Sequence, residues 1–294
     1  GGIYQLILAL VSVAKRLGVV FHFNTPVDQV LTKKKRVVGL DIGGENLAAD
    51  FVVANTEASQ LLGPLLGRPL RRPKDLSTSL WTAIIRGNKT SHPQHAAHTV
   101  YFPADYSAEF EALFDHGHVA NAPSIYICDP TLAHDLNAWE ETKPLFLMVN
   151  TPAIERTPLP ILRAEWRRIR QLSLTRLHED GLCTEDADVP WERNSLQLQD
   201  RFPGSFGALY GQSSSHWRAA FTRPGIQAAG VEGLVLASGS GHPGGGLPLT
   251  ALSGSQAAAH LNKQASKRGF TTSKTSRLPR KSYIRTPRVT GEFS

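Results

Sequence analysis

The chain opens with apolar residues at helical spacing and then changes to the pattern of strands. Apolar positions three and four residues apart predict a helix over residues 3–17, and Gly18 follows as a stop signal. β-Branched and aromatic residues predict a strand over 19–24, and 27–42 predicts two strands around a Lys-rich turn. A further apolar strand is expected at 51–54. One helix and several strands in so short a stretch indicate part of an α/β domain.

The pattern changes between residues 57 and 205. A helix is expected over 161–181, and four apolar strands separated by polar or helical stretches are expected at 79–87, 98–103, 124–130 and 144–151. This region predicts a separate α+β domain with a mostly antiparallel sheet. The chain then returns to a short buried strand within 230–238 and a helix of small residues over 250–261. The fold class predicted for the whole chain is therefore α/β plus α+β.

Composition and charge narrow the function classes. A hydrophobic content of 41% and a charged content of 19% are globular values that exclude wholesale disorder. The net charge of +7 is concentrated at one end, because residues 262–294 carry nine Lys or Arg against one acid. We expect this segment to be a disordered basic tail, with a nucleic-acid arm or attraction to anionic membranes as alternatives. Cys128 and Cys183 form no C-x-x-C pattern, so a reducing compartment is expected.

Two groups of side chains are weak candidates for a metal site and a catalytic site. His92, His95 and His98 could in principle hold zinc, but Pro93 breaks any helix that would align them. No nearby carboxylate or thiol completes a shell, so no metal is expected. Serines stand beside His216, but no G-x-S-x-G elbow occurs and no orienting acid is identifiable, which disfavours acyl-transfer chemistry.

A glycine-rich loop lies between the expected strand at 230–238 and the expected helix at 250–261. Gly239, Gly241 and Gly244 have the spacing G-x-G-x-x-G, and free backbone N–H groups at a helix N-terminus bind anionic oxygens. The acidic partner expected about twenty residues later would fall in the basic segment. Prolines 243 and 248 also fit poorly with a helix that starts among the glycines. The loop is therefore not the primary dinucleotide motif.

The run GLVLASGSGHPGGGLPLTALSGSQAA, residues 233–258, resembles the C-terminal flavin-facing segment of the carotenoid desaturase family of FAD enzymes. The matching residues are Gly241, His242, Pro243, Gly244, Gly246, Pro248, Leu252, Ser253 and Gly254. The first thirty residues resemble the family segment leading into the strand against the adenosine half of FAD. The resemblance covers roughly residues 1 to 261.

The resemblance implies FAD as cofactor and a glutathione-reductase-type, Rossmann-like FAD domain made of residues 1–56 and 206–261. It implies a substrate domain at 57–205, with 262–294 as the tail. The residues expected to bind FAD are Val27, Gly239, Gly241, His242, Pro243, Gly244, Gly245, Gly246, Leu247 and Pro248. No side chain is assigned as general base, and His242 is either a flavin neighbour or a structural group of the loop.

The family's own G-x-G-x-x-G, which lies near its N-terminus, is absent from these residues. We therefore expect a fragment or a truncated chain, whose pyrophosphate site is incomplete. Two alternatives stay open: a working flavoenzyme, and a non-catalytic remnant that binds no FAD.

Residues 204–225 and Leu249 resemble the hydroxycarotenoid 3,4-desaturase branch of the family more than phytoene desaturase, which remains the alternative. The resemblance implies an acyclic carotenoid substrate with a hydroxyl or methoxy group at C-1. Tyr210, Ser213 and His216 are candidates to contact that group. It also implies a cytoplasmic protein in peripheral contact with a membrane, with no specific nucleic-acid partner; the oligomeric state is left open.

Overall fold

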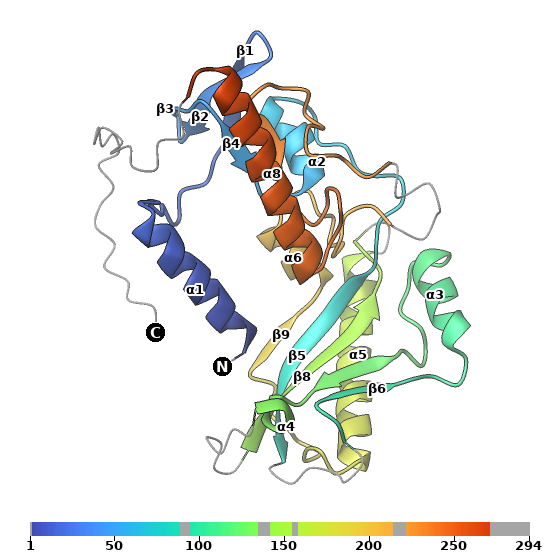
Figure 1. Cartoon of the computed structure of the whole chain (residues 1–294). Coiled ribbons are helices and arrows are strands. Elements are labelled where there is room, and N and C mark those ends of the chain that lie inside the picture. The colour runs from blue at the N-terminus through green and yellow to red at the C-terminus, as the bar shows by residue number, and fades with distance from the viewer. Residues whose placement is uncertain (1, 89–94, 135–141, 155–157, 214–221, 271–294) are drawn as a thin grey trace.

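The computed structural model describes residues 2–88, 95–134, 142–154, 158–213 and 222–270. The chain begins with α1 (Ile3–Arg16), which lies to one side of the molecule and has no buried residue (Figure 1). No strand forms at 19–24, so that prediction was wrong. A strand needs a neighbour to satisfy its backbone groups, and no described strand pairs with this segment.

The first part of the chain builds two small sheets. A three-stranded antiparallel sheet contains β1 (Gln29–Lys33), β2 (Arg36–Ile42) and β3 (Glu45–Ala48). β4 (Val52–Ala54) pairs in parallel with β10 (Leu234–Leu236), although residues 55–233 separate the two. The short helices α2 (Ala58–Leu62) and η1 (Pro64–Leu66) follow β4. A shared core of Val30, Val37, Leu61, Leu65, Leu234 and Leu236 joins the two ends of the chain.

The middle of the chain forms a second body around a five-stranded sheet (Figure 1). Every pair of strands in it is antiparallel, as the sequence predicted. In spatial order the strands are β6 (His98–Tyr101), β7 (Ile125–Cys128), β8 (Thr142–Thr151), β5 (Ser79–Asn88) and β9 (Trp191–Arg193). α5 (Leu159–Glu179) packs on this sheet with apolar residues at helical spacing: Leu162, Trp166, Ile169 and Leu177. The remaining helices here are α3 (Tyr106–Phe114), α4 (Pro130–His134) and α6 (Ser195–Arg201).

The last described helix, α8 (Leu247–Lys267), begins and ends elsewhere than predicted. It starts directly after Gly246, with Pro248 in the first turn, where the missing proline N–H breaks no helical hydrogen bond. It also continues six residues past the predicted end at Leu261. Residues 271–294, the rest of the predicted tail, lie outside the described residues.

The contacts of Arg268 explain why the end of α8 is ordered. This side chain pairs with Glu232 at 2.8 Å, donates to the carbonyl of Asp50 at 3.0 Å and stacks 4.6 Å from the ring centre of Phe51. Gln264, one turn earlier, accepts from the backbone N–H of Gly233 at 3.0 Å. These contacts tie the helix to both strands of the parallel pair.

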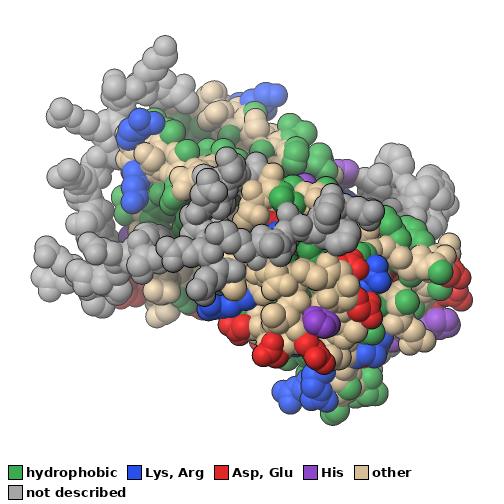
Figure 2. All heavy atoms as spheres, turned by 90° about the horizontal axis from the view of Figure 1, so that it is seen from below, with side chains coloured by type: hydrophobic (Ala, Val, Ile, Leu, Met, Phe, Trp, Pro, Cys, Tyr) green, Lys and Arg blue, Asp and Glu red, His purple; other side chains and the backbone are tan. Residues whose placement is uncertain are grey.

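The described surface is mixed in charge. On the face shown in Figure 2, acidic and basic side chains lie close together over the same part of the molecule. Among the described helices, none is both long enough and apolar enough to span a bilayer.

Candidate flavin loop and adjoining cavity

The glycine loop leaves β10 at Ala237 and reaches α8 at Leu247. At most of its glycines, an added Cβ would lie within 4 Å of other protein atoms. A Cβ on Gly241 would lie 2.9 Å from Leu236 Cδ2, and one on Gly245 would lie 2.6 Å from Tyr210 Cε1 and closer still to Cδ1. Both distances are shorter than a carbon contact allows, so these positions need glycine for close packing inside the protein.

Arg223 fastens this loop to the segment that contains Tyr210. Its side chain is 9% exposed. Nη1 donates to the carbonyls of Gly239 at 2.9 Å and Tyr210 at 3.1 Å, and Nη2 donates to the carbonyl of Gln212 at 3.1 Å. A guanidinium has several donors in a fixed plane, which lets one side chain hold three carbonyls. Arg223 therefore fixes the start of the glycine loop relative to residues 210–212.

Glu57 and Ser240 complete the polar cluster behind the loop. The backbone N–H of Ala58 donates to Ser240 Oγ at 2.8 Å, and Ser238 and Ser240 share a hydrogen bond at 3.0 Å. Burial raises the pKa of Glu57 above its usual value, while a hydrogen bond to Ser240 and the charge of Arg223 oppose this. Burial lowers the pKa of Arg223, and the Glu57 carboxylate opposes that change. The cluster joins the residues after β4 to the loop after β10.

The far end of the loop is open. Gly246 has φ of +97°, and no atom lies within 4 Å of the position that a Cβ would occupy there. It caps α8 without a side-chain hydrogen bond, and the N–H groups of Leu247 and Leu249, in the first turn, have no helical partner. Leu247 is 51% exposed and Pro248 is exposed. This end of α8 points toward the body that holds the five-stranded sheet (Figure 1).

The other residues expected to bind FAD differ in burial and position. His242 and Pro243 are half-buried, and the N–H of His242 donates to the carbonyl of Pro224 at 2.8 Å. Gly244 is buried with φ of +130°. Val27 is 37% exposed and lies in the irregular segment before β1, which the structure does not bring into the glycine loop.

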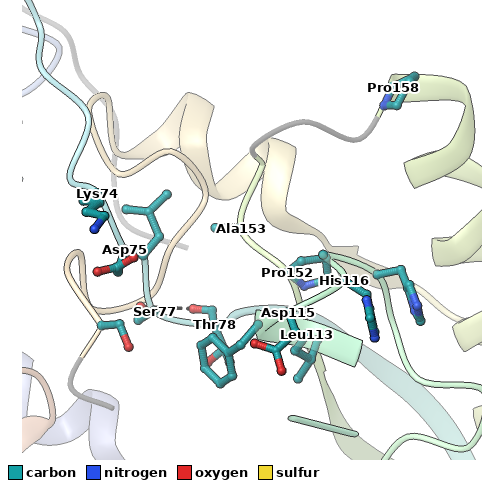
Figure 3. Close-up of a pocket in the computed structure, with 15 residues that line it drawn as sticks. Lys74, Asp75, Ser77, Thr78, Leu113, Asp115, His116, Pro152, Ala153 and Pro158 are labelled. Carbon is teal, nitrogen blue, oxygen red and sulfur yellow. Dashed lines mark hydrogen bonds between the residues drawn. The ribbon is translucent and has the colours of Figure 1, made fainter. Parts of the chain in front are cut away.

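A cavity of about 710 Å³ opens beside the segment that Arg223 holds (Figure 3). One wall is the chain before β5, with Lys74, Asp75, Ser77 and Thr78; Ser213 also lines the cavity. The other wall comes from the end of α3 and the chain after β8: Leu113, Phe114, Asp115, His116, Pro152 and Ala153. Ser77 Oγ accepts from the N–H of Tyr210 at 3.0 Å. The cavity wall therefore contacts the residue whose ring packs on the glycine loop.

Two of the three clustered histidines bind to tyrosines of the five-stranded sheet. His95 bonds to the Tyr101 hydroxyl at 3.2 Å and His98 to the Tyr126 hydroxyl at 2.8 Å, both on the five-stranded sheet. His92 and His216 lie outside the described residues. Within the parts of the chain that are described, no three His, Cys, Asp or Glu side chains gather as a metal site.

Sequence reasoning missed the roles of Arg223 and Glu57. The available signal was the segment F-T-R-P-G, residues 221–225, which had served only to compare branches of the family. Tyr210 had been considered as a contact for a substrate hydroxyl. Its ring packs against Gly245, and its contact with a substrate stays a prediction.

The sequence and this geometry can be compared with known proteins. Residues 1–262 match the family described as flavin containing amine oxidoreductase, and the chain belongs to that family. Family membership implies FAD as the cofactor and an oxidoreductase as the class of enzyme.

Its relatives include several carotenoid enzymes. Hydroxyneurosporene desaturase from Rubrivivax gelatinosus is 30% identical over 285 residues, which cover 91% of this chain and 53% of the relative. A zeta-carotene-forming phytoene desaturase from Myxococcus xanthus is 30% identical, covering 86% and 50%. A 1-hydroxycarotenoid 3,4-desaturase from a Flavobacterium species is 28% identical, covering 86% and 52%. The chain thus spans about half the length of the curated relatives it matches.

A solved structure supports the fold. An oxidoreductase from Methanosarcina mazei aligns with a TM-score of 0.56 at 17% identity, covering 87% of this chain and 54% of the other. At this identity the match supports the oxidoreductase fold alone.

The open end of the glycine loop fits a flavin. The space beside Gly246 admits a flat group close to the backbone, and the N-terminus of α8 favours negative charge. Leu249 and Leu252, on the first turns of α8, are 40% and 46% exposed and offer apolar surface next to these donors. A ring system with an apolar face and an electron-rich edge matches that combination.

Proposed function

We propose that this chain supplies the flavin-facing loop and the substrate domain of an FAD-dependent carotenoid desaturase. In this proposal residues 1–56 and 206–261 belong to the flavin domain and 57–205 form the substrate domain. The observation that carries it is the glycine loop: Arg223 and Tyr210 hold its inner part, and Gly246 leaves its outer end open. The relatives' names supply the substrate class.

The N-terminus of α8 makes the site favourable for negative charge. Bound FAD would supply the redox chemistry, by accepting a hydride from the substrate. The free N–H groups of Leu247 and Leu249 stabilise negative charge placed beside them, helped by the dipole of α8. No ionisable side chain is assigned a proton-transfer role in this proposal. His242 remains a flavin neighbour or a structural group of the loop.

The five-stranded sheet offers a surface for a long apolar substrate. On one face of β5 and β8, Leu80, Ile84, Phe146 and Met148 are half-buried, whereas Thr82 on that face is buried and Arg86 is exposed. An apolar polyene would pack on such a face. Because that substrate partitions into lipid, the proposal includes peripheral contact with the cytoplasmic surface of a membrane.

The finer proposal is desaturation at C-3,4 of an acyclic carotenoid with a hydroxyl or methoxy group at C-1. Segment 204–225 and Leu249 resemble that branch of the family. Relatives named hydroxyneurosporene desaturase and 1-hydroxycarotenoid 3,4-desaturase also favour it. Phytoene desaturation is the second candidate, because a relative of that name is similar over most of the chain.

The test is expression of the encoded protein in two strains, one accumulating phytoene and the other 1-hydroxyneurosporene. Pigments are then analysed and bound flavin is measured on the purified protein. We expect bound FAD and conversion of the hydroxylated substrate. Conversion of phytoene alone would overturn the C-3,4 assignment, and folded, colourless, inactive protein would indicate a remnant.

A matched pair of variants tests the loop itself. Gly246→Val should lower the flavin content, because its side chain would fill the open end of the loop. Gly230→Val, at another exposed glycine of positive φ with no atom within 4 Å of a Cβ, is the control and should keep its flavin. Equal flavin in wild type and Gly246→Val would remove the loop from the site.

A further inference from the structure

The cavity in Figure 3 differs in character from the half-buried apolar face of the sheet. Polar side chains lie on both walls: Lys74, Asp75, Ser77 and Thr78 on the chain before β5, and Asp115 and His116 on the opposite wall. Apolar groups, chiefly Leu113, Phe114 and Pro152, form part of the opposite wall. A cavity that combines many polar groups with some apolar surface fits the end of a molecule whose polar group terminates a hydrocarbon chain.

The cavity lies close to the glycine loop along the chain and in space. Ser213 lines the cavity and Tyr210 packs on Gly245, and three extended residues span at most about 10 Å. The hydrogen bond from the Tyr210 N–H to Ser77 Oγ at 3.0 Å makes this link direct. A group bound at Ser77 or Thr78 would therefore lie near whatever the glycine loop holds.

This proximity limits where a substrate's reacting bond can lie. In a 1-hydroxy carotenoid the oxygen-bearing carbon is two bonds from C-3, so the polar group and the reacting bond are neighbours. A substrate that reacts deep within an unsubstituted chain would leave hydrocarbon against the polar wall. Polar groups left without partners in this way are costly, and sites built around a hydroxyl discriminate strongly against analogues lacking it.

We propose that this cavity binds the polar C-1 end group of an acyclic carotenoid, with the Thr78 side chain as a specificity-determining hydrogen-bonding group. This inference rests on the proposed function. Thr78 is half-buried on the cavity wall. Its carbonyl already accepts from the N–H of Leu209 at 3.0 Å and from Ser77 Oγ at 3.2 Å, which fixes the backbone that carries the side chain. A hydroxyl can donate to an ether or alcohol and also accept from an alcohol.

The test uses Thr78→Val, which removes the hydroxyl and keeps the shape. Thr175→Val, at an exposed position on α5, is the matched control. Each full-length protein is assayed with 1-hydroxyneurosporene and with neurosporene. We expect Thr78→Val to raise KM for the hydroxylated substrate roughly threefold to tenfold, as loss of one hydrogen bond predicts, and to leave KM for neurosporene unchanged. Equal effects on both substrates, or no effect on either, would overturn the assignment of Thr78.

A binding measurement separates this inference from the proposed function. Wild type and both variants are incubated with each carotenoid in detergent, and the pigment retained after gel filtration is quantified. Preferential retention of the hydroxylated pigment that Thr78→Val loses would support the cavity even if the wild type desaturates nothing. Equal retention of both pigments by the wild type would overturn the cavity, whatever the activity.

Discussion

Gly245 provides a direct test of how the flavin loop is held. A Cβ at this position would lie 2.6 Å from Tyr210 Cε1, so Gly245→Ala forces either the ring or the loop to move. Overpacking of this kind costs about 1–3 kcal/mol. For a chain of this size each kcal/mol lowers Tm by roughly 2–4 °C. We expect urea and thermal unfolding of Gly245→Ala, followed by circular dichroism, to show a loss in that range.

The cost should depend on the Tyr210 ring. Tyr210→Leu in the same chain removes the ring atoms that the new methyl would meet, so Gly245→Ala should cost much less in that background. Gly254→Ala is the control: no atom lies within 4 Å of its Cβ position in the middle of α8, and alanine should stabilise the helix by about 0.5–1 kcal/mol. An equal cost of Gly245→Ala with and without the tyrosine ring would refute the reasoning.

Three further predictions follow from other contacts. Truncation after Phe270 should leave Tm unchanged. Truncation after Leu261 removes the hydrogen bonds of Gln264 and Arg268 and should lower the free energy of unfolding in urea by about 2 kcal/mol. Equal effects of the two truncations would mean that the end of α8 contributes nothing to stability. Lys143→Met should cost about 3–5 kcal/mol, because it leaves the buried Asp129 without its 2.5 Å partner, and Asp129→Leu in the same protein should restore most of that loss. The pKa of Glu57 is raised in the folded chain, so the stability of the wild type should fall as pH rises from about 4.5 through the folded pKa. Glu57→Gln should flatten this trend. Parallel profiles of the urea midpoint for wild type and variant from about pH 4 to 8 would contradict the prediction.

The sequence predicted best where local pattern decides structure. The apolar runs at 79–87 and 144–151, bounded by polar stretches, predicted strands, and these form β5 and β8 of the antiparallel sheet. The segment 19–24 has an equally strong strand composition but forms none, because pairing depends on a partner that local composition does not reveal. The end of α8 was placed too early because Arg268 counted as part of a charged tail, whereas its partners Glu232 and Asp50 are distant in sequence.

The sequence predicted the place of the glycine loop between β10 and α8, but not the contacts that hold the loop. The motif located the glycine loop, yet it gave every glycine the same role. The structure separates Gly241 and Gly245, which pack inside the protein, from Gly246, which faces outward. Arg223 could not have been identified from spacing, because the three carbonyls it binds come from two different segments of the chain.

The parallel pairing of β4 with β10 has a consequence for how the chain reaches its fold. Residues near these strands bond across 182 positions, as Ala58 does with Ser240. Closing a loop of that length costs about 4–5 kcal/mol of chain entropy before any contact repays it. The five-stranded sheet lies wholly between β4 and β10 in the sequence and can form first. Its formation shortens the flexible chain that must close when β4 pairs with β10. During synthesis β4 cannot pair with β10 until residues 234–236 have left the ribosome, so it stays open to misassembly longer than the strands of the five-stranded sheet.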